Sequence, residues 1–329
     1  MITGKISENV TKRSVLRLMK KHREEINSAV LGSDCAFFAS ENVTDMVSST
    51  AIITYTDRCM GEVAVYRMAD TLAAAGAEPV GIMADVLLAP DNKEDELKKI
   101  VNGLEETCAM LNMQIMQVQA EVTEAVVRPV LTVTGFGYRR PETKHCNPLL
   151  VKPGQDIVIT KYIGLEGTYL LAAEYADKIA GKLPLHFVDT ALSFKDDLSV
   201  IKEAVAAANH ASYMHAVTEG GIFAALWNLG ELSKKGLTVD LKKIPIRQET
   251  VEICEIFKLN PYQMMSTGAL LIVTEDGEGL VDGLMSQGIS ATVIGRITDT
   301  NDRIVINEDE TRYLDLPKPD EIFSVNNSL

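Results

Sequence analysis

Segments with the apolar spacing of amphipathic helices alternate with short apolar runs along the whole chain of 329 residues. The stretch 62–75 has helical spacing, and Gly76 just after it can adopt the positive φ that often ends a helix. The stretch 79–88 (PVGIMADVLL) has the composition of a buried strand. Because helices and strands that alternate in this way pack as layers, the sequence predicts an α/β or α+β protein.

The remaining predicted elements continue this alternation. Helices are expected over 9–21, 92–111, 164–176, 197–209, 222–234, 251–257 and 277–287. Strands are expected over 51–55, 113–118, 129–136, 156–160, 237–241, 268–273 and 291–297. No internal repeat or low-complexity tract interrupts them.

A charged, proline-rich stretch divides these elements into two groups. Residues 138–155 (YRRPETKHCNPLLVKPGQ) contain three prolines and a Pro-Gly turn. The length of the chain is also that of two ordinary domains. We therefore expect one domain over residues 1–150 and a second over residues 151–329.

The charge balance of the chain excludes some classes of partner. Lys and Arg number 32 and Asp and Glu number 46, which gives a formal net charge of −14. A chain this acidic repels the phosphates of nucleic acids and of anionic membranes. No uninterrupted apolar run reaches the roughly 18 residues that a membrane span needs, and the N-terminal stretch lacks the apolar core of a signal peptide. These features predict a cytoplasmic protein that binds neither nucleic acid nor membrane.

Five cysteines are scattered through the chain without a C-x-x-C pair. An odd and dispersed set of this kind argues against a disulfide framework and against a structural zinc site. Each cysteine is therefore expected to be a small buried apolar residue.

The clearest local motif is Thr218-Glu219-Gly220-Gly221, which runs directly into the helix predicted from residue 222. Paired glycines allow backbone N–H groups to approach an anion closely, and a helix N-terminus adds favourable partial charge. One interpretation is a cradle for a phosphate group. The alternative is a capping turn in which Thr218 or Glu219 satisfies the end of the helix.

A second loop has similar features. Lys161 follows a predicted strand, and Gly164 and Gly167 lie at the start of the next helix. The lysine could pair with a phosphate and the glycines could let it approach. A Gly-x-x-Gly spacing before a helix is common, however, so an ordinary helix start is the alternative.

Carboxylates at the edges of predicted elements could bind Mg²⁺ together with a nucleotide. Magnesium prefers hard oxygen ligands, usually one or two carboxylates plus phosphate oxygens. The candidates are Asp34, Asp57, Asp70 and Glu121. The alternative for each is a solvated or capping carboxylate.

Several longer motifs occur in the order in which one known superfamily carries them. They are GKIS and KRSVLR near the start, LAAAGAEPVGI at 72–82, EVTEAVVRPVLTVTGFG at 121–137, TKYIGLEGT at 160–168, MHAVTEGGIFAALW at 214–227, IPIRQETVEICE at 244–255 and NPYQMMSTGALLI at 260–272. With these motifs the chain resembles, over essentially its whole length, the superfamily of aminoimidazole ribonucleotide (AIR) synthase. That superfamily includes HypE, selenophosphate synthetase and thiamine-monophosphate kinase, and the HypE-like branch is the most similar.

The resemblance implies a fold and a chemistry. It implies an N-terminal α+β domain that pairs with its twin, so that strands of two subunits form a β-barrel, and a C-terminal α/β domain beside it. It also implies ATP and Mg²⁺ in a cleft that borders the barrel. Proteins of the HypE type dehydrate a carbamoyl group carried on a C-terminal cysteine, but this sequence has Leu329 at that end.

The motifs depart from the family pattern at acidic positions. Ala51 stands where the family usually has the Asp of Ser-Thr-Asp, Cys59 where it has the Asp of Asp-Ile-Gly, and Ala216 where it has the Asp of Met-His-Asp. Asp34 matches the family's Gly-Glu-Asp motif, although Ser33 replaces its Glu. A magnesium site with fewer carboxylates should hold a metal–nucleotide weakly.

Two functional hypotheses follow from the motifs and their departures. The first is an ATP-dependent enzyme that acts on a small carboxamide or carboxylate, as in hydrogenase maturation. Magnesium would then bind Asp34, Asp70 and Glu121, and the nucleotide or another phosphate ligand would bind Asp34, Lys161, Gly164, Gly167, Thr218, Glu219, Gly220 and Gly221. The second is a non-catalytic relative that acts as a partner or regulatory subunit. A homodimer, or a heterodimer with an intact paralogue, is expected.

Overall fold

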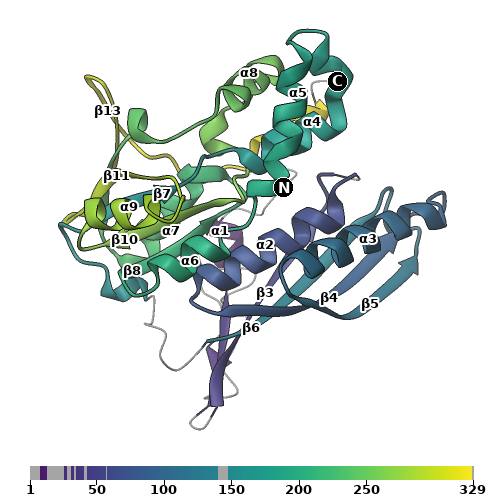
Figure 1. The fold of residues 1–329 in the computed structure, drawn as a ribbon, viewed down its shortest axis with the longest axis horizontal. Helices are drawn as coiled ribbons and strands as arrows, with labels where there is room; N and C mark the ends of the chain where they lie inside the picture. The colour runs from purple at the N-terminus through teal and green to yellow at the C-terminus, as the bar shows by residue number, and fades with distance from the viewer. Residues whose placement is uncertain are drawn as a thin grey trace.

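The structure is a computed structural model that describes residues 8–12, 26–27, 31–32, 35–40, 43–56, 58–139 and 147–327. Two β-sheets form its framework, and helices lie against each of them (Figure 1). The first sheet takes its strands from the chain up to Tyr138, and the second from Asp156 onwards. The predicted mixed α/β architecture is confirmed.

The first sheet has six strands among the described residues, in the order β1-β2-β3-β6-β4-β5. β4 and β5 are parallel, and the other neighbours are antiparallel. Buried residues alternate with half-buried ones along β6, as expected for a sheet with one covered face. The strands are β1 (Ile26–Asn27), β2 (Ala36–Ser40), β3 (Val43–Ile53), β4 (Glu78–Leu88), β5 (Gln114–Val122) and β6 (Val130–Tyr138).

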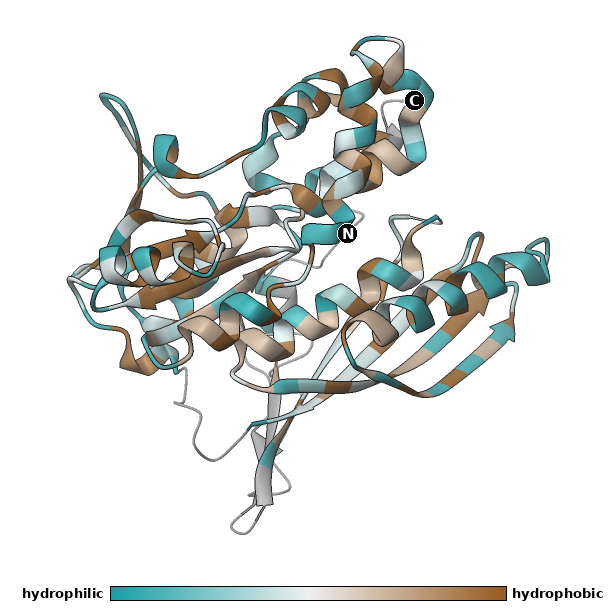
Figure 2. Ribbon diagram, viewed as in Figure 1, coloured by the Kyte–Doolittle hydropathy of each residue, from teal (hydrophilic) through white to brown (hydrophobic). Residues whose placement is uncertain are grey.

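The second sheet has seven strands, in the order β13-β12-β9-β11-β7-β10-β8. Only β9 and β12 are parallel neighbours. Every residue of β8 and of β10 is buried, and Figure 2 shows the hydrophobic colour that runs along this sheet. The strands are β7 (Asp156–Thr160), β8 (Ala211–Val217), β9 (Gly236–Asp240), β10 (Ala269–Thr274), β11 (Ala291–Thr298), β12 (Arg303–Asn307) and β13 (Glu310–Tyr313).

Helices complete the two layers. α2 (Met60–Ala74) and α3 (Glu94–Met110) lie on one face of the first sheet, after the short α1 (Glu8–Thr11) (Figure 1). The later helices are α4 (Leu165–Ala180), α5 (Leu185–Ser193), α6 (Ile201–Ala207), α7 (Gly221–Ser233), α8 (Gln248–Phe257) and α9 (Gly277–Met285). Short 3-10 turns are η2 (Pro148–Leu150), η3 (Phe194–Asp197), η4 (Leu241–Lys243), η5 (Pro261–Gln263) and η6 (Glu321–Asn327).

Helix α2 joins the two halves of the molecule. All of its residues except Glu62 are buried, although it carries the charged Arg67 and Asp70. Its last residues, Ala73 and Ala74, share an apolar cluster with residues of β8, β10 and α9. A charged side chain on a helix that is covered on all sides must find its partners inside the protein.

The structure corrects several predicted elements. The helix expected over 197–209 is confined to α6, because the residues before it form η3 and an irregular segment. β8, α5 and the β12–β13 hairpin are elements that the sequence pattern did not predict. Most of the helix expected over 9–21 lies outside the described residues.

Three further predictions concern properties that reach beyond a single chain or domain. Both sheets are open among the described residues, so the barrel that the family resemblance implies needs a second subunit and stays a prediction. The domain boundary near residue 150 also stays a prediction. Within the described part of the chain, no helix has the length and apolarity that a membrane crossing requires. The cytoplasmic location stays a prediction as well.

Candidate functional site

The two glycine loops singled out in the sequence lie together in the structure. Gly164 precedes α4 and Gly220 precedes α7, with positive φ angles of 73° and 81°. Ser266 bridges them, because its hydroxyl accepts a hydrogen bond from the N–H of Gly164 at 2.8 Å. The N–H of Ser266 also donates to the carbonyl of Thr218 at 3.3 Å. The two helix starts therefore form one region.

Close packing explains why glycine is required in both loops. A Cβ atom on Gly221 would lie 2.6 Å from the carbonyl oxygen of Tyr262, and the φ of Gly221 is +63°. A Cβ atom on Gly167 would lie 2.6 Å from the sulfur of Met264. Neither position has room for a side chain. These two glycines are explained by their contact with the segment 261–266, without a ligand.

A buried ionic network crosses from α2 to these loops. The guanidinium of Arg67 lies 3.6 Å from a carboxylate oxygen of Glu166 and 3.7 Å from one of Glu219. The hydroxyl of Tyr55 donates to Glu166 at 2.9 Å, and the guanidinium lies 5.3 Å from the centre of the Tyr55 ring. Glu166 has no exposed surface. The network thus joins residues that precede or lie on α2 to residues of the second half of the chain.

The surroundings of this network shift its proton affinities. Burial by itself lowers the pKa of Arg67, but its interactions with Tyr55 and with the carboxylates of Glu166 and Glu219 outweigh burial and raise that pKa. Burial raises the pKa of Tyr55 well above its usual value. Arg67 is therefore a permanent cation and Tyr55 a neutral hydrogen-bond donor.

The N–H of Gly220 is already bonded to a carboxylate of the chain itself. Asp320 lies 100 positions further along, and its Oδ2 accepts the N–H of Gly220 at 2.6 Å. Its Oδ1 accepts the N–H of Ile322 at 3.0 Å. Asp320 is only 1% exposed, and burial raises its pKa to about 7. At this helix start Asp320 therefore satisfies the N–H of Gly220, while the carbonyl of Thr218 accepts the N–H of Gly221 at 3.1 Å, as in the predicted capping turn.

Asp70, a predicted magnesium ligand, is fully buried and holds a backbone segment. Its Oδ1 accepts the N–H of Val200 at 2.8 Å. Burial raises its pKa well above the usual value for aspartate, although hydrogen bonds from backbone N–H groups oppose this. One oxygen of this carboxylate is thus bound within the protein, whereas Oδ2 has no hydrogen-bond partner among the described residues.

Lys161, a predicted phosphate ligand, holds the same segment from the other side. Its ammonium donates to the carbonyls of Asp197 and Ser199 at 2.8 and 2.5 Å, and it pairs with Glu203 at 2.9 Å. Together with Asp70 it fixes the irregular residues that replace the first part of the predicted helix. Its donors are engaged by these three acceptors.

The described residues include only two of the three predicted magnesium ligands, Asp70 and Glu121, so the predicted site stays a prediction. Glu121 is exposed on β5, whereas Asp34 and Asp57 lie outside the described residues. Among the residues that the structure does describe, no three His, Cys, Asp or Glu side chains lie close enough to hold a metal ion. The described residues thus contain no ligand cluster of that size, and we derive no chemical step through Mg²⁺.

A small cavity lies beside the ionic network. It has a volume of about 120 Å³ and is bounded by residues around Tyr55, by α4 and by the C-terminal turn η6. Arg128 and Glu174 give it polar walls. Glu174 accepts hydrogen bonds from the hydroxyl of Thr56 at 2.9 Å and from the N–H of Arg58 at 3.2 Å.

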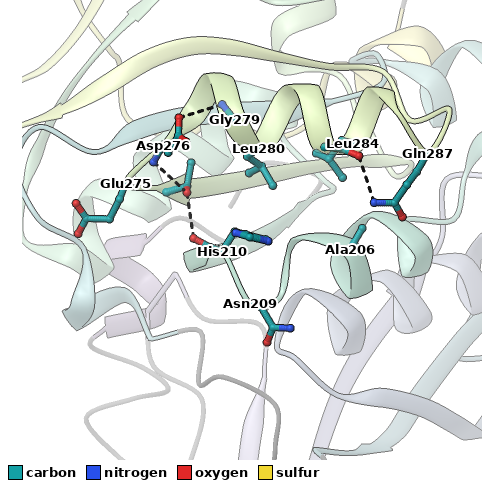
Figure 3. Close-up of a pocket in the computed structure, with 11 residues that line it drawn as sticks. Ala206, Asn209, His210, Glu275, Asp276, Gly279, Leu280, Leu284 and Gln287 are labelled. Carbon is teal, nitrogen blue, oxygen red and sulfur yellow. Dashed lines mark hydrogen bonds between the residues drawn. The ribbon is translucent and has the colours of Figure 1, made fainter.

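A larger hollow of about 380 Å³ lies between the end of α6 and α9 (Figure 3). Its polar side chains bond to nearby backbone. Asp276 accepts the N–H of Gly279 at 2.9 Å, and the amide of Gln287 donates to the carbonyl of Gly283 at 3.2 Å (Figure 3). These bonds stabilise the two ends of α9, and the hollow gives no sign of a chemical role.

Sequence reasoning missed four residues of this region, namely Tyr55, Arg67, Glu166 and Asp320. A signal was present for Arg67, which interrupts an otherwise small and apolar helix (VAVYRMADTLAA). A charge in such a segment indicates an internal partner. Asp320 had no comparable signal, because its partner is set by the path of the chain after β13.

We call the ionic network of Tyr55, Arg67, Glu166 and Glu219, together with the two glycine loops, the junction. The fold thus has two β-sheets covered by helices, with this polar and charged junction between them. The AIR synthase related N-terminal domain model matches residues 14–138, and the corresponding C-terminal domain model matches residues 152–307. The chain therefore belongs to the AIR synthase related family.

Relatives with descriptive names are similar over most of the chain. A putative hydrogenase expression/formation protein of Methanocaldococcus jannaschii is 26% identical over 277 residues, which cover 80% of this chain and 78% of that protein. The crystal structure of Escherichia coli HypE, a hydrogenase maturation protein, has a TM-score of 0.71 at 18% identity and covers 84% and 86% of the two chains. A structure of HypE in complex with ATP has a TM-score of 0.67 at 15% identity, with coverages of 87% and 89%. At these identities the solved structures establish the fold.

Proposed function

We propose that this chain is a HypE-like protein of hydrogenase-type maturation whose Mg-ATP chemistry is weakened. In its ancestral form the activity would be ATP-dependent activation of a small carboxamide or carboxylate. Support comes from the matched family models, from the Methanocaldococcus relative named for hydrogenase formation, and from the HypE structure that contains ATP.

The observation that carries the weakened chemistry is the state of Asp70. This chain has Ala51, Cys59 and Ala216 at positions where the family pattern has Asp. Asp70 is one of the acidic residues that remain as candidate magnesium ligands. Its carboxylate is fully buried and accepts the N–H of Val200 at 2.8 Å. Its Oδ2 has no hydrogen-bond partner among the described residues, but burial raises the pKa of this carboxyl, and a magnesium ion needs an ionised carboxylate that it can reach. A carboxylate in this environment is poorly suited to that role.

The chain retains groups that suit a phosphate. The N–H of Gly220 at the start of α7 and the guanidinium of Arg67 are donors that favour an oxyanion. In the proposed function these groups orient a phosphate. The buried walls of the junction would exclude water from it.

The test is thermal unfolding of the full chain with ATP, with and without Mg²⁺, over a range of concentrations. A ligand at 100 times its Kd adds about 2.7 kcal/mol to the unfolding free energy. We expect ATP to raise the melting temperature, and added Mg²⁺ to change that rise little. A rise that depends strongly on Mg²⁺ would contradict the weakened chemistry, and no rise at millimolar ATP would contradict nucleotide binding.

A second candidate function is that of a partner subunit without catalysis. The open face of the first sheet favours it, because Met46 and Ile52 on β3 are 49% and 59% exposed, and Met83 on β4 is 36% exposed. Exposed apolar side chains gathered on one sheet face are typical of interaction surfaces. A homodimer would give twice the chain mass in solution, whereas capture of an intact paralogue from native lysate would favour the heterodimer.

A further inference from the structure

The last part of the chain returns to the junction after leaving the second sheet. Residues 315–319 follow β13 without regular structure, and they include Pro317 and Pro319. Within them, Leu316 is 58% exposed. From Asp320 onwards the segment is held against the protein, with Ile322 and Val325 at 7% and 3% exposure. We call residues 315–327 the C-terminal strap.

The strap is attached through the buried carboxylate of Asp320 and through several apolar side chains. Asp320 accepts the N–H of Gly220 at 2.6 Å. Ile322 and Val325 belong to the apolar cluster that includes residues of α4, and the ring of Phe323 meets that of Tyr55 edge-on at 6.1 Å. The same strap residues form one wall of the 120 Å³ cavity. The strap is therefore docked from Asp320 onwards, whereas the residues that lead into it, such as Leu316, are exposed.

A second observation points to an anion larger than one carboxylate. The side chain of Arg67 is 7% exposed, yet its Nε and Nη2 atoms have no hydrogen-bond partner among the described residues. Its ion-pair distances of 3.6 and 3.7 Å are longer than the roughly 2.7–2.9 Å of a direct charged hydrogen bond. One of its partners is Glu219, the residue next to Gly220. This buried guanidinium therefore has N–H groups without a hydrogen-bond acceptor, and its Nη1 lies 3.7 Å from a carboxylate oxygen of the residue that precedes Gly220.

The charges at this point are unevenly balanced. The negative groups that act on Arg67 include Glu166, Glu219 and Asp320, and the carboxylates of Glu219 and Asp320 repel each other. Asp320 thus occupies its place against both burial and a like charge. A phosphate-bearing ligand that displaces Asp320 brings negative charge of its own next to Glu219, so its binding depends on the N–H groups of Arg67 that have no hydrogen-bond acceptor among the described residues.

We propose that the C-terminal strap closes the loop 218–221, and that Asp320 holds the position of an oxyanion of a phosphate-bearing ligand. The ligand and the strap compete, so binding of the ligand releases the strap. This inference rests on the phosphate ligand of the proposed function. It adds to that function an internal competitor that sets the affinity.

The test uses inorganic tripolyphosphate and, separately, ATP, with binding to the full chain measured by calorimetry. Asp320→Asn removes the competing charge while it keeps the size of the side chain. The matched control is Asp315→Asn, because Asp315 is in the same segment but is 76% exposed and pairs only with Lys318 at 3.8 Å. We expect Asp320→Asn to bind tripolyphosphate at least tenfold more tightly than the unchanged chain, and Asp315→Asn to bind like the unchanged chain.

Release of the strap is measured independently by hydrogen exchange. Tripolyphosphate should speed exchange in the peptide that covers residues 319–325. If Asp320→Asn fails to fold, Ile322→Ala provides the second variant, because it weakens docking of the strap without touching the loop. It should also bind more tightly than the unchanged chain.

Each outcome gives a decision. Equal affinities of the unchanged chain and both variants, or ligand binding that leaves exchange at 319–325 unaltered, would overturn the strap while ATP binding could still stand. Tighter binding of tripolyphosphate by the variants with no binding of ATP would support the strap and reject the nucleotide function. No binding of either ligand by any variant would reject both.

Discussion

The two sheets of this protein differ in how completely their residues are buried. Along β6 of the first sheet every second residue is covered and the others are partly open, whereas β10 of the second sheet is buried at every position. The sequences differ accordingly, since VLTVTGFGY alternates and ALLIVT is almost continuously apolar. The second sheet is complete within one chain. The first sheet has one face that the described residues leave exposed, with Met46, Ile52 and Met83 on it.

The junction between the two sheets follows a third pattern. Here charged groups are buried, and partners come from both halves of the chain. Removing one partner of a buried ion pair lowers the free energy of unfolding strongly, because the other charge then stays buried without a partner. Stability should therefore depend on the junction and the second sheet, while association should depend on the open face of the first.

The largest expected effect is at the junction. Arg67→Ala leaves the fully buried carboxylate of Glu166 without its cation, and we expect a loss of about 3–5 kcal/mol in the free energy of unfolding. The matched control is Arg58→Ala, which also removes a pair with a glutamate of α4, but at a side chain that is 69% exposed. That change should cost at most about 1 kcal/mol. Urea unfolding measures both, and equal costs would show that burial does not set the strength of the junction.

The second comparison sets the two sheets against each other. Leu271→Ala, in β10 between β7 and β8, removes a fully buried side chain and should cost about 2–5 kcal/mol. Ile52→Ala, on the open face of β3, should change stability by less than about 0.5 kcal/mol.

The same open face can be tested for association. Ile52→Asp should reduce the mass measured by sedimentation from that of a dimer to that of one chain. A single-chain mass for the unchanged protein would contradict the predicted homodimer. A loss of stability from Ile52→Ala as large as that from Leu271→Ala would show that the face is covered within the chain.

The smallest expected effect is a dependence on pH that comes from Asp320. Its pKa in the folded protein is raised to about 7, above the ordinary value for aspartate, so the folded state holds a proton that the unfolded chain has already lost. The contribution of this group to stability therefore falls as pH rises from about 4 to about 7. The groups that face Asp320 are Glu219 on the loop, Arg67 on α2 and Cys254 on α8.

Comparison with Asp320→Asn isolates this group from the other carboxylates. Between pH 5 and pH 8 the unchanged chain should lose about 2–3 kcal/mol of unfolding free energy relative to the variant. Denaturant unfolding at the two pH values provides the measurement. A constant difference between the two proteins would mean that Asp320 keeps an ordinary pKa in the folded state.

Much of the fold could be predicted from the sequence, because the signals involved are local. The helix predicted over 62–75 is α2, and the strand predicted over 79–88 is β4, each within a few residues. Strand β8 was missed because Ser212 and His215 interrupt its apolar residues, so it lacks the continuous apolar run that indicated β10. The predicted start of the helix at 197 was wrong, because those residues are held in an irregular path by Lys161 and Asp70.

The sequence by itself determined the layered architecture, the two helix starts that need glycine and the acidic character of the chain. Periodicity, turn chemistry and charge each depend on residues close together in sequence. Only the tertiary structure decided what the chemical groups do. Asp70 meets Val200 across 130 positions and Asp320 meets Gly220 across 100 positions. Contacts over such separations depend on strand order and on the path of the chain, and no local pattern contains either.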